Sequence, residues 1–176
     1  MNKQNSMRQI KIEKITLNIG TGGPGDKMEK AIKLLTKISG MKPVETKTMK
    51  RIPTWGLRPK LSIGVKVTVR GKKAEELLSR LIKSLDNKVD PKKFDKSGNL
   101  SFGIREYIDI PGVQYDMDIG IIGLEAAVTL IRPGFRVRRR KIRQSKIPTR
   151  HRITKQEAIE FISNKFGAII EEGESS

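Results

Sequence analysis

Residues 61–70 read LSIGVKVTVR, the cleanest alternation of apolar and polar residues in the chain. Successive side chains of a strand point to opposite faces, so this period of two predicts a strand with one apolar and one polar face. Residues 14–19, KITLNI, show a shorter alternation and predict a second such strand. Half-buried strands of this kind are typical of antiparallel sheets that carry helices on one face only.

Three helical patterns lie between and after these strands. Asp26 begins the first helix, and Gly40 ends it in the manner of a helix C-cap. The second is predicted over about residues 73–85, where leucines recur at helical spacing. The third opens at Thr154 with the capping box TKQE and closes at Gly167.

The remaining apolar segments predict strands at residues 44–47, near 100–110 and near 119–131. We therefore predict an α+β fold, a single domain with a largely antiparallel sheet, helices packed on one face and long basic loops. The domain is expected to span residues 1–170, followed by a disordered acidic tail at 171–176.

The composition restricts the chemistry that this chain can perform. The 176 residues include 37 Lys and Arg but only 19 Asp and Glu, which gives a net charge of +18. The absence of cysteine excludes disulfides and cysteine zinc sites and suits a reducing, cytoplasmic compartment. A single histidine disfavours metal centres and acid–base catalysis, so no metal and no cofactor are expected. No apolar run approaches a membrane span, so we expect no membrane association and a polyanion as partner.

The most basic segment is residues 132–152, which hold ten Lys or Arg and no acid. Prolines and glycine disfavour a helix there, so we predict a basic extension loop that becomes ordered on RNA phosphates. A solvated loop or a localisation tract is the alternative. Phe135, Val137, Ile142 and Ile147 are expected to anchor the loop to the domain. Its candidate RNA-binding residues are Arg132, Arg136, Arg138, Arg139, Arg140, Lys141, Arg143, Lys146, Arg150 and Arg152.

Two further regions offer polar contacts. The polar sides of the first two predicted strands carry Lys14, Thr16, Asn18, Lys66, Thr68 and Arg70. Together they could form a platform that contacts RNA, or remain an ordinary solvent face, and periodicity does not show whether the strands are neighbours. Residues 50–60 form a basic loop with the only tryptophan, Trp55, which either tucks onto the core or projects. Aromatic residues are only 5% of the chain, so reading the shape and phosphates of folded RNA is favoured over base stacking.

A glycine-rich loop suggests a different class of function. Residues 20–25, GTGGPG, fit the G-x-G-x-x-G pattern between a strand and a helix, with Glu45 further on. This alternative would be a nucleotide-dependent RNA-modifying or remodelling enzyme. Pro24 removes a backbone donor, βαβ alternation is absent, and a catalytic constellation is lacking, so a tight turn is favoured.

Several motifs in order make a family resemblance specific. They are IEKITLNIG at 12–20, ISGMKP at 38–43, TK at 46–47, GVKVTVRG at 64–71 and FDKSGNLSFGIRE at 94–106. Together they closely resemble the universal large-subunit ribosomal protein five family, and RPGF at 132–135 and HRIT at 151–154 resemble its archaeal and eukaryotic branch.

The resemblance implies a non-enzymatic protein of the cytoplasmic large ribosomal subunit that attaches 5S rRNA in the central protuberance. Its implied partners are 5S rRNA, 23S rRNA, P-site tRNA, small-subunit ribosomal protein thirteen and the neighbouring 5S-associated large-subunit protein eighteen. The implied 5S rRNA-binding residues are Lys14, Thr16, Asn18, Lys42, Thr46, Lys47, Lys66, Thr68 and Arg70. The implied tRNA-contact residues are Lys50, Arg51, Thr54, Trp55, Arg58 and Lys60.

An acidic stretch is the counterpart of the basic segments. Residues 106–131 hold five acids and no Lys or Arg, so RNA should repel them. Asp109, Asp116 and Asp118 are therefore expected to point away from 5S rRNA and to form the small-subunit bridge that the resemblance implies. The alternative is that these acids pair with Lys or Arg of the same chain.

Overall fold

The computed structural model describes residues 5–171. A five-stranded sheet, in the order β2-β3-β1-β6-β5, forms its centre, and every neighbouring pair is antiparallel. The strands are β1 (Lys11–Gly20), β2 (Val44–Lys47), β3 (Ser62–Val69), β5 (Leu100–Ile104) and β6 (Leu124–Ile131). The predicted α+β fold with an antiparallel sheet is confirmed.

The alternation in the sequence translates directly into burial. In β3, Val65, Val67 and Val69 are buried, whereas Lys66 between them is exposed. The alternation therefore assigned these side chains to the correct faces, whereas Gly64 on the predicted polar face is also buried and Ile63 on the predicted apolar face is only half-buried.

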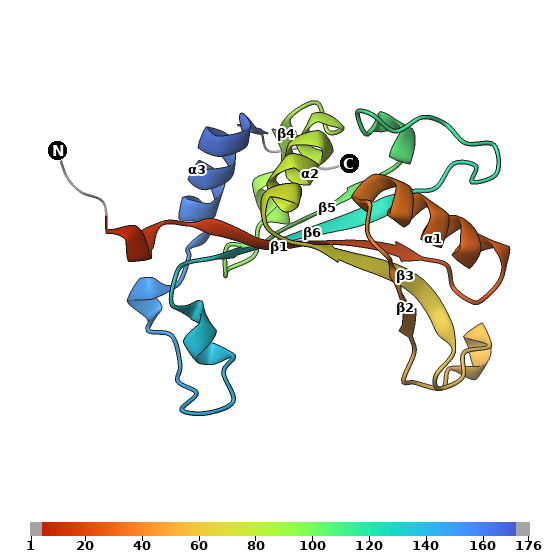
Figure 1. The fold of residues 1–176 in the computed structure, drawn as a ribbon, viewed down its shortest axis with the longest axis horizontal. Helices are drawn as coiled ribbons and strands as arrows, with labels where there is room; N and C mark the ends of the chain where they lie inside the picture. Colours follow the sequence, from red (N-terminus) through yellow and green to blue (C-terminus); the bar gives the residue numbers. More distant parts are fainter. Residues whose placement is uncertain (1–4, 172–176) are drawn as a thin grey trace.

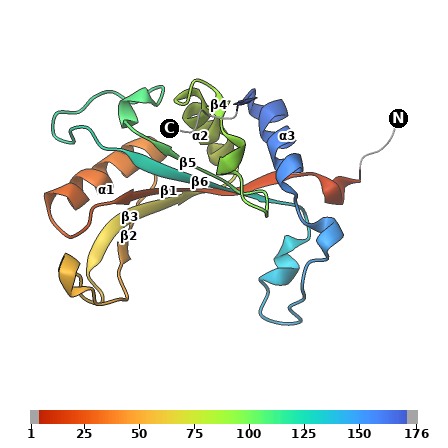
Figure 2. The same cartoon turned by 180° about the vertical axis from the view of Figure 1, so that it is seen from behind.

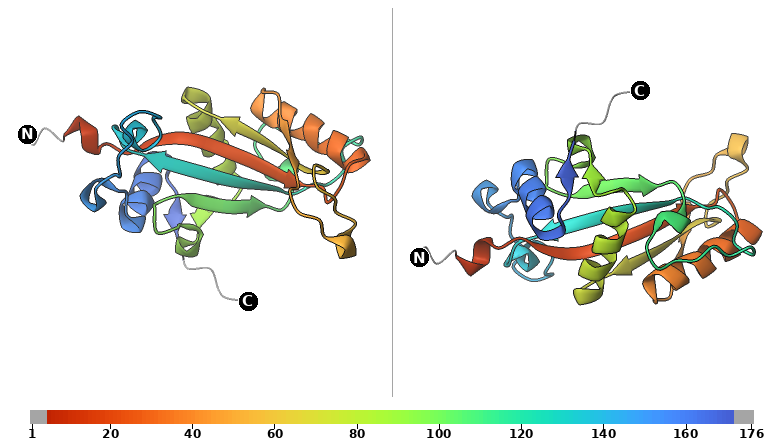
Figure 3. Two further views of the ribbon diagram at one scale, coloured as in Figure 1. Left: turned by 90° about the horizontal axis from the view of Figure 1, so that it is seen from below. Right: turned by 90° about the horizontal axis from the view of Figure 1, so that it is seen from above.

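The three helices of the described chain lie on the same side of the sheet (Figures 1 and 2). They are α1 (Asp26–Ser39), α2 (Lys72–Lys83) and α3 (Lys155–Phe166). Gly40 ends α1 in the left-handed conformation with φ 63°, as its position in the sequence predicted. The core lies between this helical layer and the sheet, with Leu34 of α1 and Leu78 of α2 fully buried. The other face of the sheet carries no α-helix of residues 5–171 (Figure 3).

Two predicted strands are shorter than expected. The strand predicted to reach residue 110 ends at Ile104, and the short 3₁₀ turn Tyr107–Asp109 follows. The strand predicted from residue 119 begins only at Leu124. Just before it, Gly123 lies close to the end of β5, since a Cβ there would lie 2.8 Å from the backbone oxygen of Arg105.

The end of the described chain contains a pairing that the sequence did not predict. β4 (Lys88–Val89) and β7 (Ile169–Ile170) form a small parallel sheet beside the main one. Glu171 forms a salt bridge of 2.9 Å to Lys88, so the predicted disordered tail begins with a placed residue. The rest of that predicted tail, residues 172–176, lies outside the described residues.

Short 3₁₀ segments complete the fold. They are Ser6–Arg8, Pro53–Trp55, Pro91–Lys93, Tyr107–Asp109, Phe135–Arg138 and Thr149–His151. Within residues 5–171, none of the helices has the length and apolar character needed to cross a membrane.

Candidate nucleic-acid interface

Two loops project from the side of the sheet that carries no helix. One is the hairpin loop, residues 48–61, which joins β2 to β3; the other is the arm, residues 132–152, which follows β6. Figure 1 shows both below the sheet, with the helices above it. We call the face of the five-stranded sheet opposite α1, α2 and α3 the open face. The two basic loops predicted from the sequence therefore lie at either end of it.

The open face brings together the polar residues of the first two predicted strands. β1 and β3 are neighbours, with Thr16 opposite Thr68 and Asn18 opposite Lys66. On the other side of β1, Lys14 lies opposite Thr129 of β6. The question that periodicity left open is thus answered by the strand order, which joins the two predicted polar rows into one surface.

The edge strand β2 extends this surface. Thr46 lies opposite Gly64, where a Cβ would come within 2.8 Å of the Ile19 backbone oxygen. A side chain at position 64 would therefore require the backbone to shift. Val44, opposite Lys66, is an exposed apolar member that sequence reasoning did not assign to the surface. Lys42 and Lys47 are exposed at the two ends of β2.

Glu125 is an acidic residue of the open face that sequence reasoning assigned elsewhere. It lies opposite Asn18, whose side-chain amide donates to it over 3.2 Å. Its place in the alternation of β6 was the available signal, since Leu124 and Ala126 on either side are buried. The Asn18 side chain is therefore already hydrogen-bonded to a neighbour on the same surface.

Glu13 is a second acid at this surface, and its side chain is only 8% exposed. It sits at an irregularity of β1, between Ile12 and Lys14, and accepts hydrogen bonds from Arg139 of the arm and from Arg70, which follows β3. Burial alone would raise the pKa of the Glu13 carboxyl, but these two hydrogen bonds together with the positive charges of Arg139 and Lys14 outweigh burial and hold that pKa below its ordinary value. Glu13 thus connects the arm to the sheet through its ion pair with Arg139.

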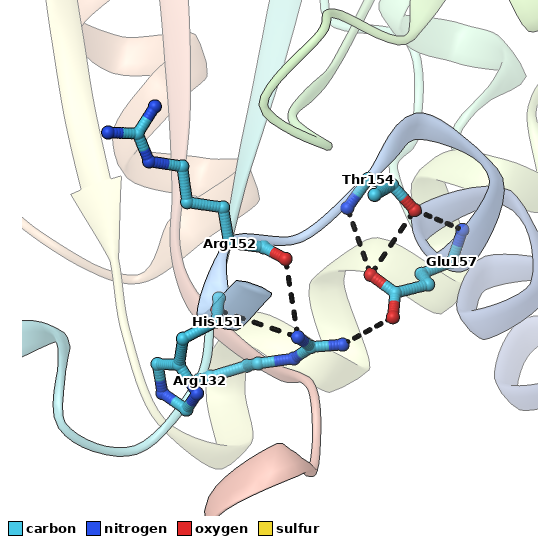
Figure 4. Close-up of polar contacts among 5 residues, drawn as sticks. All are labelled: Arg132, His151, Arg152, Thr154 and Glu157. Carbon is cyan, nitrogen blue, oxygen red and sulfur yellow. Dashed lines mark hydrogen bonds and ion pairs between the residues drawn. The ribbon is translucent and has the colours of Figure 1, made fainter. Parts of the chain in front are cut away.

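Arg132 differs from the other cations of the arm because its side chain is only 6% exposed. Figure 4 shows its guanidinium between the start of α3 and the end of the arm, where it donates to Glu157 over 2.6 Å and to the backbone oxygen of Arg152 over 3.2 Å. Glu157 also accepts from the Thr154 backbone N–H over 2.9 Å, completing the predicted capping box. Arg132 therefore joins the two ends of the arm, and its 6% exposure leaves little surface for the RNA contact predicted for it.

The pKa of Glu157 reflects this arrangement. The hydrogen bond from the Thr154 backbone lowers it most, burial opposes that effect, and the hydrogen bond from Arg132 lowers it further. The net result is a pKa below the ordinary value of a glutamate. The carboxylate therefore remains charged and bound to Arg132 at neutral pH.

The rest of the arm is held by a few apolar contacts. Ile147 is buried, and the Phe135 ring packs edge-on against His151 with 5.8 Å between ring centres. The expected anchoring by Ile142 is wrong, since this side chain is 80% exposed. Arg136, Arg138, Arg140, Lys141, Arg143, Lys146, Arg150 and Arg152 are all exposed and form no ion pair within residues 5–171.

The hairpin loop projects with its tryptophan outward. The backbones of Ile52 and Leu57 pair with each other and close a narrow tip. Trp55 at this tip is 74% exposed, so the projecting interpretation is correct and the tucked one is wrong. The tRNA-contact residues inferred from the resemblance, Lys50, Arg51, Thr54, Trp55, Arg58 and Lys60, are all exposed.

Residues 106–120 of the acidic stretch lie on the helix side of the sheet, near α1, and away from both projecting loops (Figure 1). Glu125 in β6 lies on the open face instead, so the expectation that the whole stretch points away from this surface is wrong for that residue. Asp116 pairs with Lys37 of α1 over 3.3 Å, so internal pairing, the alternative to a bridge, applies to this residue. Asp109 and Asp118 are exposed and form no ion pair in the described part of the chain.

The glycine-rich loop does not have the geometry of a phosphate-binding loop. The backbone N–H groups of Thr21 and Gly22 both donate to the oxygen of Ile63, over 3.0 and 3.1 Å. These donors are therefore used within the protein, and the antiparallel sheet of the described residues lacks the βαβ unit that dinucleotide binding requires. The structure thus contradicts the nucleotide-binding alternative and supports a tight turn.

Comparison with known proteins covers almost the whole chain. Residues 5–58 match the family model described as Ribosomal protein L5, and residues 62–161 match the model that describes the C-terminus of the same ribosomal protein family. A relative from Sulfurisphaera tokodaii is 47% identical over 170 residues, covering 96% of each chain. Another, from Nanoarchaeum equitans, is 49% identical over 168 residues, covering 95% of this chain and 99% of the relative.

A relative from Methanosphaera stadtmanae is 44% identical over 167 residues, covering 95% of this chain and 99% of the relative. All three relatives carry the name Large ribosomal subunit protein uL5. The resemblance drawn from the ordered motifs is confirmed, and an enzymatic role is not supported. The chain therefore belongs to the ribosomal protein L5 family, a family of structural ribosomal proteins without enzymatic activity.

Proposed function

We propose that this chain is a structural component of the cytoplasmic large ribosomal subunit that binds 5S rRNA on its open face and helps attach it in the central protuberance. The observation that carries the proposal is the polar surface formed where Thr16 meets Thr68 and Asn18 meets Lys66. This surface is flanked by two loops rich in exposed cations, the arm and the hairpin loop. Its hydroxyl and amide groups can reach ribose and base edges while lysines neutralise phosphates.

Replacing Thr68 with valine is expected to weaken 5S rRNA binding by about 1–3 kcal/mol, because the shape is kept while the RNA partner of the hydroxyl loses its hydrogen bond. Lys66→Ala should lower the slope of log affinity against log salt by about one unit. Filter binding across a salt series measures both effects.

Thr36→Val is the matched control for this substitution, since Thr36 is an exposed threonine of α1 on the other side of the sheet. It should leave 5S rRNA binding unchanged. Wild-type affinity in Thr68→Val would refute the assignment of the 5S rRNA contact to the open face.

We also propose that the hairpin loop contacts P-site tRNA. Trp55→Ala is expected to speed the loss of P-site tRNA about tenfold, since contact between an aromatic ring and a nucleotide contributes about 1–3 kcal/mol. The side chain is exposed, so the free energy of unfolding should change by less than about 0.5 kcal/mol. Dissociation of tRNA from ribosomes carrying the variant, together with a thermal melt, measures both. Loss of 5S rRNA binding in this variant would instead assign the loop to the rRNA contact.

Two further contacts belong to the same proposal. The arm would bind rRNA, of the 5S or the 23S molecule, because its exposed cations lie on the same side as the open face. The acidic stretch would face small-subunit ribosomal protein thirteen through the exposed Asp109 and Asp118, with Asp116 already paired to Lys37. Large-subunit protein eighteen would be the neighbour on 5S rRNA.

A further inference from the structure

A hollow of about 810 Å³ lies between the arm and the turn that precedes β5. Four cations line it: Lys96 from the turn, and Arg138, Lys146 and Arg152 from the arm. No aspartate or glutamate is among its described lining residues. None of the four cations forms an ion pair within residues 5–171. A concave surface with this charge focuses a positive potential and attracts an anion.

The turn is held rigidly in front of the arm. The Asp95 carboxylate accepts from the backbone N–H groups of Ser97 and Asn99, over 2.8 and 2.7 Å. Gly98 has φ +76°, and a Cβ there would lie 2.7 Å from the Ile153 side chain. The turn is therefore shaped by its own side chains and packed against the segment that leads into α3. This keeps Lys96 opposite the arm without help from a ligand.

The hollow does not end at the arm. A second hollow of about 680 Å³ shares Ser97, Phe135 and Arg138 with the first. It extends to Lys14 and Thr129, the facing pair of the open face. Its lining also includes Glu13, whose carboxylate already accepts hydrogen bonds from Arg70 and Arg139. The two hollows are therefore continuous and lead from the arm to the open face. Such a path suits a chain with repeated anionic groups better than a single small anion.

We propose that the first hollow binds the phosphodiester backbone of an rRNA segment that continues onto the open face, with Lys96 as a phosphate-binding residue. This inference rests on the proposed function and adds to it a site built by the turn at residues 95–99. Lys96 and Lys146 contact the phosphates from opposite walls, and Ser97 lies where the path turns toward the sheet.

Lysine acetylation tests the site on the unaltered protein. Two samples are treated with an amine-acetylating reagent: the free protein, and the protein bound to 5S and 23S rRNA of the source organism. The extent of acetylation at each lysine is then measured by mass spectrometry in both samples. Lys96 and Lys146 should be protected by rRNA, while Lys83, exposed on α2 across the sheet, should react equally in both samples. Millimolar inorganic phosphate in place of rRNA should give no protection; if it protects both lysines fully, the site binds a free anion and the rRNA path is refuted.

Retention of the complex on a filter in the same samples separates the possible failures. If rRNA is bound but Lys96 stays fully reactive, the proposed site is wrong while the proposed function stands. If no rRNA is bound, both are overturned.

A pair of variants gives an independent measurement. Lys96→Ala should weaken rRNA binding roughly five- to eightfold at 0.1 M salt, which is the share of one phosphate contact when log affinity falls by about 0.7–0.9 for each decade of salt. Lys83→Ala removes the same charge from the helix side and should change the affinity by less than about twofold, because attraction between exposed charges is largely screened beyond about 10 Å at this salt. Equal losses of affinity in the two variants would show that Lys96 acts only through the net charge of the protein. They would refute its proposed role as a phosphate-binding residue.

Discussion

Replacing Arg136, Lys141, Arg143 and Arg150 together with glutamine is expected to weaken rRNA binding about a thousandfold at 0.1 M salt. Each phosphate contact contributes about 0.7–0.9 to the salt slope, so four lost contacts remove about three decades of affinity at this salt. All four side chains are exposed on the arm and donate no hydrogen bond within residues 5–171. The fold should therefore tolerate the change, and filter binding between about 0.05 and about 0.5 M salt measures the affinity.

The matched control removes four cations from the helix side of the molecule. Its substitutions to glutamine are at Lys30 and Lys33 of α1 and at Lys73 and Lys83 of α2. Both variants have the same net charge, so a purely general effect of charge would weaken both equally. We expect the control to lose less than about tenfold, because long-range attraction is screened beyond about 10 Å at this salt. Equal losses would show that the arm has no special position in RNA binding.

Glu157→Ala is expected to destabilise the fold by about 3 kcal/mol. Removing one partner of a buried ion pair costs about 3–5 kcal/mol, and the 39% exposure of the Glu157 side chain reduces that through solvent screening. Loss of the capping interaction with Thr154 adds about 1 kcal/mol. For a chain of this size the melting temperature should fall by about 10 °C, which calorimetry measures.

Two variants separate the contributions of the Arg132 pair and the cap. Thr154→Ala removes only the cap and should cost about 1 kcal/mol. Glu160→Ala removes an exposed glutamate of the same helix, and its effect should stay within about 0.5 kcal/mol. A loss in Glu157→Ala no larger than that in Thr154→Ala would mean that Arg132 finds other acceptors and that the ion pair contributes nothing.

The same ion pair makes stability depend on pH. The pKa of Glu157 is lowered from its ordinary value of 4.5, so its contribution is fully present above that value and is lost as the pH falls through the lower pKa of the folded state. The difference in unfolding free energy between wild type and Glu157→Ala should therefore shrink below about pH 4.5. Urea unfolding at neutral and at acidic pH checks this, and a constant difference would argue against a charged carboxylate.

The sequence alone determined the elements that depend on local periodicity and local capping. The strict alternation of residues 61–70 predicted which side chains of β3 are buried, since a strand places them on opposite faces in turn. The capping box at Thr154 and the glycine at position 40 predicted helix ends for the same local reason. The ordered motifs also identified the family, because such a succession of short segments rarely arises by chance.

Tertiary structure alone decided which of these elements are neighbours and which charges are free. Periodicity assigns a residue to a face but not a strand to a partner, so only the sheet order shows that Thr16 lies beside Thr68. Charge likewise does not reveal burial: Arg132 belongs to the most basic segment of the chain and is almost enclosed by its contacts with Glu157 and a backbone oxygen. Lys96 lies far from the arm in sequence and faces it across a hollow, because the turn that carries it packs against the segment leading into α3. These features depend on contacts between distant segments, which have no period or spacing along the chain that could reveal them.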